Sequence, residues 1–100
     1  MTTAESKPAY WLANVEVTDA EAYGRYAALA GDAILAHGGE MLARSGRHHQ
    51  LEGRDRSRNV VVRFPSLEAA VACYESPQYQ EALAHARGAS VRDIVVVEGL

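Results

Sequence analysis

Residues 59–83 constrain the fold of this chain most, because they read as a buried strand followed by two capped helices. The segment opens with NVVVRF, whose β-branched and aromatic residues favour a pleated, mostly buried surface. Pro65 ends this strand, and Ser66 is a good N-cap for a helix. Ser76 and Pro77 repeat the start signal, with Ser as the cap and Pro at the first helical position. The segment therefore predicts a strand, a helix, a break and a second helix.

The residues before this segment predict a second strand–helix unit. Tyr10–Val17 (YWLANVEV) reads as a strand, and the alanine-rich segment Ala20–His37 reads as a helix. Thr18 and Glu21 have the spacing of a capping box at the start of that helix. The two glycines that follow His37 end it.

Between these units we expect a β-hairpin. Glu40–Arg44 predicts a short strand, Ser45 and Gly46 a tight turn, and His48–Glu52 the returning strand. Arg92–Glu98 (RDIVVVE) predicts the last strand.

The order of elements predicts an α+β fold. Two β-α-β units joined by a hairpin give a ferredoxin-like βαββαβ sandwich, with the second helix split in two and both helical units on one face of an antiparallel sheet. Residues 1–8 are expected to form a mobile tail, and residues 9–100 a single domain.

Composition excludes several classes of partner. The net charge of −3 gives no general attraction to nucleic acid or to an anionic membrane. No apolar run reaches the roughly 18–20 residues that span a bilayer. The single cysteine, Cys73, cannot form an internal disulfide, which fits a reducing cytoplasm. We expect a cytoplasmic protein without a nucleic-acid or membrane partner.

The sheet face that the helices leave open has a mixed pattern. Strict alternation, which assumes no β-bulge, places Leu12, Leu42 and Val61 on this face beside polar and ionisable residues. The run Ile94–Val97 is apolar on both faces of its strand, which suggests burial on both sides. We infer that a second copy of the chain covers this face, as a two-fold homodimer that encloses a partly polar space.

Several segments together resemble a known family. These are YWLANVEVTDAEAYGRY, HGGEMLARSG, LEG, VVVRFPSLEAAVACYESPQYQEAL and DIVVVEG, and they resemble domain-of-unknown-function family 1330 over about residues 9–99. The resemblance implies a ferredoxin-like protomer of the dimeric α+β barrel superfamily. Relatives in that superfamily include antibiotic-biosynthesis-type monooxygenases, muconolactone isomerases and haem-degrading enzymes. The resemblance implies no particular reaction, because one fold serves many functions.

The ionisable residues assigned to the open face suggest a small-molecule site. In this hypothesis His48 and Glu52 are the catalytic residues, with His48 as a general base and the carboxylate of Glu52 beside an arginine or the histidine. Arg44 or Arg63 holds an anionic or enolate oxygen, and Asn14 orients the substrate. The alternative is a structural ion pair between Glu52 and an arginine, because structural networks perturb charges as catalytic ones do.

The helical tyrosines have two readings as well. Tyr23, Tyr26 and Tyr74 could reach a cavity between helices and sheet and bind a ligand through their hydroxyls. Alternatively they and Tyr79 are core aromatics whose hydroxyls meet the surface or the backbone, the usual arrangement for buried tyrosine. Trp11 is expected in the core.

The sequence contains no recognised metal or cofactor motif. His48 and His49 are adjacent on an expected strand and should point to opposite faces, so they cannot easily share one ion. No nucleotide-binding or serine-hydrolase motif is present. Cys73 has no CxxC partner and is expected as a packed apolar side chain. We expect no metal and no cofactor.

Two functions therefore stay open at this stage. One is a homodimeric small-molecule-binding protein, and a candidate cofactor-independent enzyme, that acts on an aromatic or carbonyl metabolite in the manner of a monooxygenase, isomerase or cyclase. The other is a non-catalytic dimeric module in which polar residues between the sheets specify only register and partner. An enclosed cavity of a few hundred Å3 that touches Glu52 and His48 would favour the first.

Overall fold

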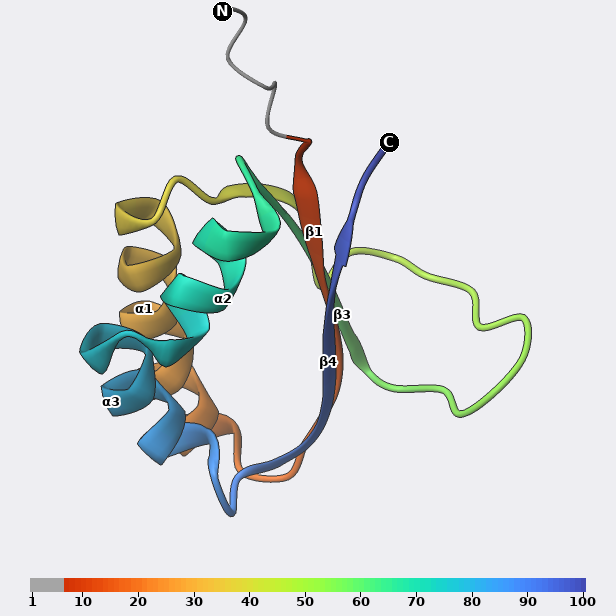
Figure 1. The fold of residues 1–100 in the computed structure, drawn as a ribbon. Coiled ribbons are helices and arrows are strands. Elements are labelled where there is room, and N and C mark those ends of the chain that lie inside the picture. The colour runs from red at the N-terminus through yellow and green to blue at the C-terminus, as the bar shows by residue number, and fades with distance from the viewer. Residues whose placement is uncertain (1–6) are drawn as a thin grey trace, which may run out of the picture.

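The computed structural model describes residues 7–100, and these fold into one layer of helices packed on one layer of sheet (Figure 1). The elements in chain order are β1 (Ala9–Val17), α1 (Ala20–Ala36), β2 (Glu40–Arg44), β3 (Arg58–Phe64), α2 (Leu67–Glu75), α3 (Pro77–Ala86) and β4 (Ser90–Glu98). All three helices cover the same face of the sheet. The predicted ferredoxin-like α+β sandwich with a split second helix is confirmed. Of the predicted tail, residues 1–6 lie outside the described residues.

The described residues form a four-stranded antiparallel sheet in the order β2-β3-β1-β4. The predicted returning strand His48–Glu52 is wrong, since these residues lie in the long loop that joins β2 to β3 (Figure 1). The segment HHQLE contains no β-branched residue, whereas β3 has three consecutive valines. β3 is therefore the better partner for β2, and it pairs with β2 in its place.

Side-chain caps set the starts of the helices. The side chains of Ser66 and Ser76 accept hydrogen bonds from the backbone N–H groups of Ala69 (3.0 Å) and Tyr79 (3.1 Å), as the sequence predicts. For α1 the predicted capping box is wrong by one residue, because Asp19 and not Thr18 is the N-cap. Gly88 follows α3 with φ +79, a left-handed conformation that glycine adopts without steric cost.

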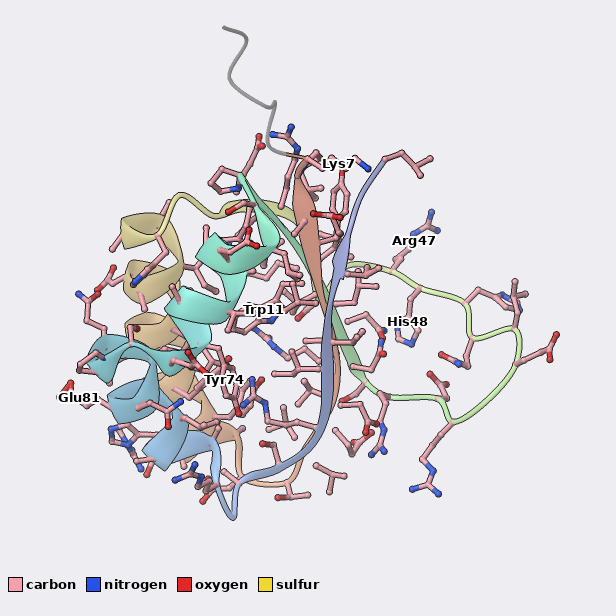
Figure 2. The ribbon with its side chains drawn as sticks, viewed as in Figure 1. Lys7, Trp11, Arg47, His48, Tyr74 and Glu81 are labelled. Atoms are coloured by element: carbon pink, nitrogen blue, oxygen red, sulfur yellow. The ribbon has the colours of Figure 1, made fainter. Side chains whose placement is uncertain are left out.

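The core lies between the helices and the covered face of the sheet. Its largest fully buried side chains include Trp11, Phe64 and Tyr79. The ring centroid of Trp11 lies 5.7 Å from that of Phe64 and 5.2 Å from that of Tyr79, in stacked and edge-on arrangements. Figure 2 shows Trp11 between the sheet and the helices. The expectation that Trp11 belongs to the core is confirmed.

A β-bulge in β2 changes which face one predicted site residue occupies. Met41 pairs with Val62 and Ala43 pairs with Val61, so Leu42 is the extra residue. Arg44 consequently pairs with Val60, whose side chain packs against the core. Strict alternation placed Arg44 on the open face, and that prediction is wrong because the bulge shifts the pattern by one residue.

The open face of the sheet carries apolar side chains. Val95 and Val97 on β4 are 56% and 47% exposed, and their partners on β1 are Leu12 and Tyr10. The sequence predicts that the run Ile94–Val97 is buried on both faces. In the single chain the helices cover only one face of β4, and the other face is exposed. Within residues 7–100, no helix has both the length and the apolar character needed to cross a membrane.

Candidate functional site

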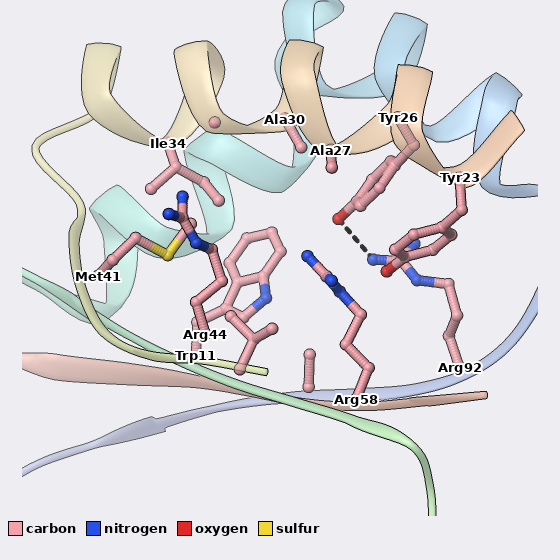
Figure 3. A pocket seen from close by; sticks show the side chains of 13 residues that line it. Trp11, Tyr23, Tyr26, Ala27, Ala30, Ile34, Met41, Arg44, Arg58 and Arg92 are labelled. Atoms are coloured by element: carbon pink, nitrogen blue, oxygen red, sulfur yellow. Dashed lines mark hydrogen bonds between the residues drawn. The ribbon is translucent and has the colours of Figure 1, made fainter. Parts of the chain in front are cut away.

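A cavity of about 190 Å3 lies between α1 and the covered face of the sheet, beside β2 and β3 (Figure 3). The side chains around it come from one helix and all four strands. Its lining residues are Trp11, Ala13, Tyr23, Tyr26, Ala27, Ala30, Gly31, Ile34, Met41, Arg44, Arg58, Val60 and Arg92.

Small residues on α1 create this space. Ala27, Ala30 and Gly31 line the cavity, and a Cβ placed on Gly31 would meet no atom within 4 Å. The alanine content that favours the helix therefore also prevents it from filling the gap above the sheet. Ile34 and Met41 close the end beside β2 (Figure 3).

A hydrogen-bonded trio forms one wall. The hydroxyl oxygens of Tyr26 and Tyr79 are 2.6 Å apart, and the Arg92 guanidinium donates to both, at 2.6 Å and 2.9 Å. The Arg92 guanidinium also lies 4.5 Å from the centre of the Tyr26 ring, a cation–π distance. Tyr26 faces the cavity, whereas Tyr79 is fully buried behind it.

Burial keeps both hydroxyls of this trio protonated. Desolvation raises the pKa of Tyr26, and the nearby Tyr79 hydroxyl raises it further. Desolvation also raises the pKa of Tyr79, although Arg92 opposes the effect. At neutral pH these side chains are therefore hydrogen-bond donors and not bases.

Three arginines reach the cavity from the sheet. Arg44, Arg58 and Arg92 extend from their strands toward α1 (Figure 3). The Arg58 guanidinium lies 5.4 Å from the centre of the Tyr23 ring. None of the three takes part in an ion pair formed within residues 7–100. No aspartate, glutamate or histidine from this part of the chain lines the cavity, so its charged groups are all cationic.

The cavity brings together three of the predicted site residues. Tyr23, Tyr26 and Arg44 line it. Tyr74 instead packs against Trp11 and Tyr79, with ring centroids 6.0 Å and 5.2 Å away, and borders a more open depression beside β4.

The other predicted site residues lie outside the cavity. Asn14 donates to the side chain of Asn59 (2.7 Å), its partner on β3, and Arg63 lies 4.0 Å from Glu40, its partner on β2. His48 and Glu52 are on the exposed loop, where His48 forms a 2.9 Å contact with Asp55 (Figure 2). The assignment of His48 and Glu52 as catalytic residues stays a prediction.

Sequence reasoning missed Arg58 and Arg92 as cavity residues. Arg58 has the same parity along its strand as the core-facing Val60 and Val62. Arg92 likewise shares the parity of Ile94 and the other inward positions of β4. A cation at a core-facing position is the signal that could have identified both residues.

No group of three or more metal-ligating side chains occurs among the residues that the structure describes. The four donors that could bind an anion, Tyr26 and the three arginines, are gathered instead around an otherwise apolar space.

Comparison with known proteins gives a family and a fold. The model of domain of unknown function DUF1330 matches residues 8–100. A protein of unknown function from Rhodopseudomonas palustris is similar in structure, with TM-score 0.77, 24% identity, and 95% of this chain and 84% of that one covered. No curated protein matches the chain.

Two more distant neighbours carry descriptions of activity. The cofactor-independent oxygenase SnoaB from Streptomyces nogalater has TM-score 0.69 and 9% identity, with 95% of each chain covered. A protein proposed to be an antibiotic biosynthesis monooxygenase, from Caulobacter crescentus, has TM-score 0.64 and 13% identity, with 96% of this chain and 92% of that one covered. At such identities the likeness shows a shared fold and not a shared reaction.

Proposed function

The chain belongs to the DUF1330 family, and on that premise we propose that it is a homodimeric small-molecule-binding protein whose ligand occupies the cavity under α1. The observation that carries the proposal is the cavity itself, which combines apolar walls with four inward-facing donors. Its volume is below the roughly 300 Å3 at which drug-sized pockets begin, so the ligand is a small metabolite.

The donors also support a candidate role in catalysis. Donors fixed in a largely apolar site stabilise negative charge that develops on a carbonyl oxygen. Tyr26, Arg58 and Arg44 are placed to do this for an aromatic or carbonyl substrate. A protein described as a cofactor-independent oxygenase has the same fold, so the fold is compatible with this class of chemistry.

The homodimer is proposed from the open face of the sheet. Val95, Val97 and Val91 are each about half exposed there, on a strand whose other face packs on the core. Val95 and Val97 lie beside Leu12 and Tyr10, their partners on β1, and an exposed apolar surface of this kind on a small domain is typical of a protein–protein interface. A second copy that packs on the same face would bury it on both protomers.

Two measurements test the ligand site, namely mass spectrometry of molecules that co-purify and the fluorescence of Trp11. Trp11 is the only tryptophan of the chain and lines the cavity, so its fluorescence reports occupancy directly. Gly31→Leu would place a side chain in the cavity, while Ala28→Leu places a leucine on the exposed side of α1, outside the cavity lining. We expect mass spectrometry to find the same small molecule in wild type and Ala28→Leu and to find it depleted in Gly31→Leu.

A panel of small aromatic and carbonyl compounds gives the second measurement. We expect some of them to change Trp11 fluorescence in wild type and not in Gly31→Leu. If nothing co-purifies and wild type responds to no compound differently from Gly31→Leu, the ligand site is refuted. The non-catalytic dimeric module, whose open-face polar groups are already paired as Asn14–Asn59 and Arg56–Asp93, would then be the better description.

A further inference from the structure

We propose that the ligand of the cavity is a small organic acid whose carboxylate binds Tyr26 and Arg58 and whose apolar body lies against α1. This inference rests on the proposed function, since it names the chemical class of the ligand at the same site. The cavity wall leaves hydrogen-bond donors of Tyr26 and Arg58 without an acceptor.

Tyr26 has a proton to donate that the protein does not use. Tyr79 is fully buried. Among the described residues, the Tyr26 oxygen is the only side-chain acceptor within hydrogen-bond distance of its hydroxyl. We assign the Tyr79 O–H as the donor to Tyr26, because the alternative leaves a buried Tyr79 hydrogen without an acceptor. Arg92 donates to both hydroxyl oxygens. The Tyr26 oxygen thus accepts two hydrogen bonds, and its own O–H remains for an acceptor in the cavity.

Arg58 is the second donor without an acceptor. Its Nε is buried and has no hydrogen-bond partner in the described part of the chain, and its guanidinium rests only on the face of Tyr23. The residue as a whole is half-buried, and a buried N–H without an acceptor is costly. A carboxylate matches the paired N–H groups of the guanidinium in geometry and charge. Arg44 brings a further positive charge to the same cavity from β2.

The remaining walls select an organic body over a bare anion. Ala27, Ala30, Ile34 and Val60 offer only apolar contact, and Trp11 adds an aromatic surface. A free inorganic anion would leave these walls without a partner. A carboxylate attached to a compact apolar group satisfies the donors and the apolar walls together.

Matched probes test the inference on the intact protein. Benzoate and benzamide have nearly the same shape and differ in charge, and inorganic phosphate supplies an anion without an apolar body. With Trp11 fluorescence as the readout, we expect benzoate to bind wild type about tenfold or more tightly than benzamide, and phosphate not to displace it at equal concentration.

Substitutions locate the anion. Arg58→Gln should lower benzoate affinity about tenfold and leave benzamide affinity unchanged. Arg58→Lys should lower it less than Arg58→Gln, because lysine keeps the charge but loses the paired N–H groups. Arg25→Gln is the control, because Arg25 lies on the exposed side of α1, where it contacts Glu21. Melting curves of each variant show whether a loss of binding reflects a loss of folding.

The outcomes separate this inference from the proposed function. Equal affinities for benzoate and benzamide, both abolished in Gly31→Leu, would overturn the organic-acid assignment and leave the binding site standing. Displacement of benzoate by equimolar phosphate would overturn the role of the apolar walls. Failure of every probe to act through the cavity, with nothing co-purifying, would overturn both proposals.

Discussion

The two hydroxyls of the buried tyrosine pair have different tasks, although they share one hydrogen bond. In the proposed arrangement Tyr79 donates to Tyr26, and the Tyr26 O–H is the one that meets a ligand in the cavity. This division follows from which ring borders the cavity and which is enclosed. The sequence predicted that helical tyrosines either pack in the core or reach a cavity, and Tyr26 does both.

Paired phenylalanine substitutions test this division. Tyr26→Phe should weaken benzoate binding several-fold, since it removes the donor, whereas Tyr79→Phe should leave it nearly unchanged. Each variant should lose about 1 kcal/mol of stability, because Arg92 keeps only one of its two acceptors. Urea denaturation and fluorescence titration measure the two quantities separately, and an equal loss of binding in both variants would contradict the assignment.

The buried thiol of Cys73 should make the stability of the fold fall at alkaline pH. Burial raises the pKa of its thiol from 9.0 to about 11, so the unfolded chain releases this proton at lower pH than the folded chain. The contribution of this group to stability is therefore complete below pH 9 and falls as the pH rises toward about 11. The raised pKa values of Tyr26 and Tyr79 act in the same direction at higher pH.

We expect the free energy of unfolding to decrease across that window. The free energy of unfolding of Cys73→Ala should decrease less steeply with pH than that of wild type, because the variant has no thiol to ionise. Urea denaturation at several pH values between 9 and 11 measures both slopes. Identical slopes would show that Cys73 ionises in the native protein as easily as in the unfolded chain.

At the scale of single elements, local signals predicted most of the fold. Serine caps, proline at the first helical position and the valine-rich strands each specify their own segment, and α2, α3 and β3 follow them closely. The predicted hairpin is wrong because a Ser-Gly turn is a local signal, whereas the partner of a strand is chosen by contacts between residues far apart in the sequence. The valines of β3, more than thirteen residues after β2, offer a better-packed neighbour than HHQLE does.

The cavity could be predicted only in part, for a related reason. Residue types identified Tyr23, Tyr26 and Arg44 as candidates, but the bulge at Leu42 decided the face that Arg44 occupies. Arg58 and Arg92 are recognisable only once the covered face of each strand is known. A bulge leaves no mark on residue type, so strand parity alone cannot reveal it.

Two glycines near the ends of α1 should respond in opposite ways to alanine. Gly24 lies on the exposed side of the helix, and an added Cβ meets nothing within 4 Å, so Gly24→Ala should stabilise the protein by about 0.5–1 kcal/mol. At Gly39 a Cβ would overlap the side chain of Ile34 and lie 2.9 Å from its carbonyl oxygen. Gly39→Ala should therefore destabilise the protein by about 1–3 kcal/mol, since the close packing there leaves no room.

Thermal and urea denaturation of both variants test this pair. Helix propensity alone would give both substitutions little or no cost, so the opposite signs depend on the close approach of Ile34 to Gly39. A stable Gly39→Ala variant would show that the start of β2 can move away from α1.

At the scale of the whole molecule, one face of the sheet remains uncovered by the protomer's own helices. Val95→Glu places a charge on the open face, on the edge strand β4 and opposite Leu12. We expect wild type to sediment at twice the 10.8 kDa protomer mass and Val95→Glu to shift toward the single protomer, because burying an unpaired carboxylate opposes association.

Leu35→Glu is the matched control for this experiment. Leu35 is 71% exposed but lies on α1, away from the open face of the sheet. The Leu35→Glu variant should sediment as wild type does. A wild type that sediments as a single protomer would refute the homodimer, and an equal effect of both variants would move the interface away from the sheet.

The extra residue in β2 also gives this strand an unusual tolerance of length. Glu40, Met41, Ala43 and Arg44 each have a fixed partner on β3, and Leu42 alone has none. Deleting Leu42 would straighten the strand while every other residue kept its neighbour and its side of the sheet. We therefore expect a variant that lacks Leu42 to keep Arg44 on the covered face of the sheet, beside the cavity.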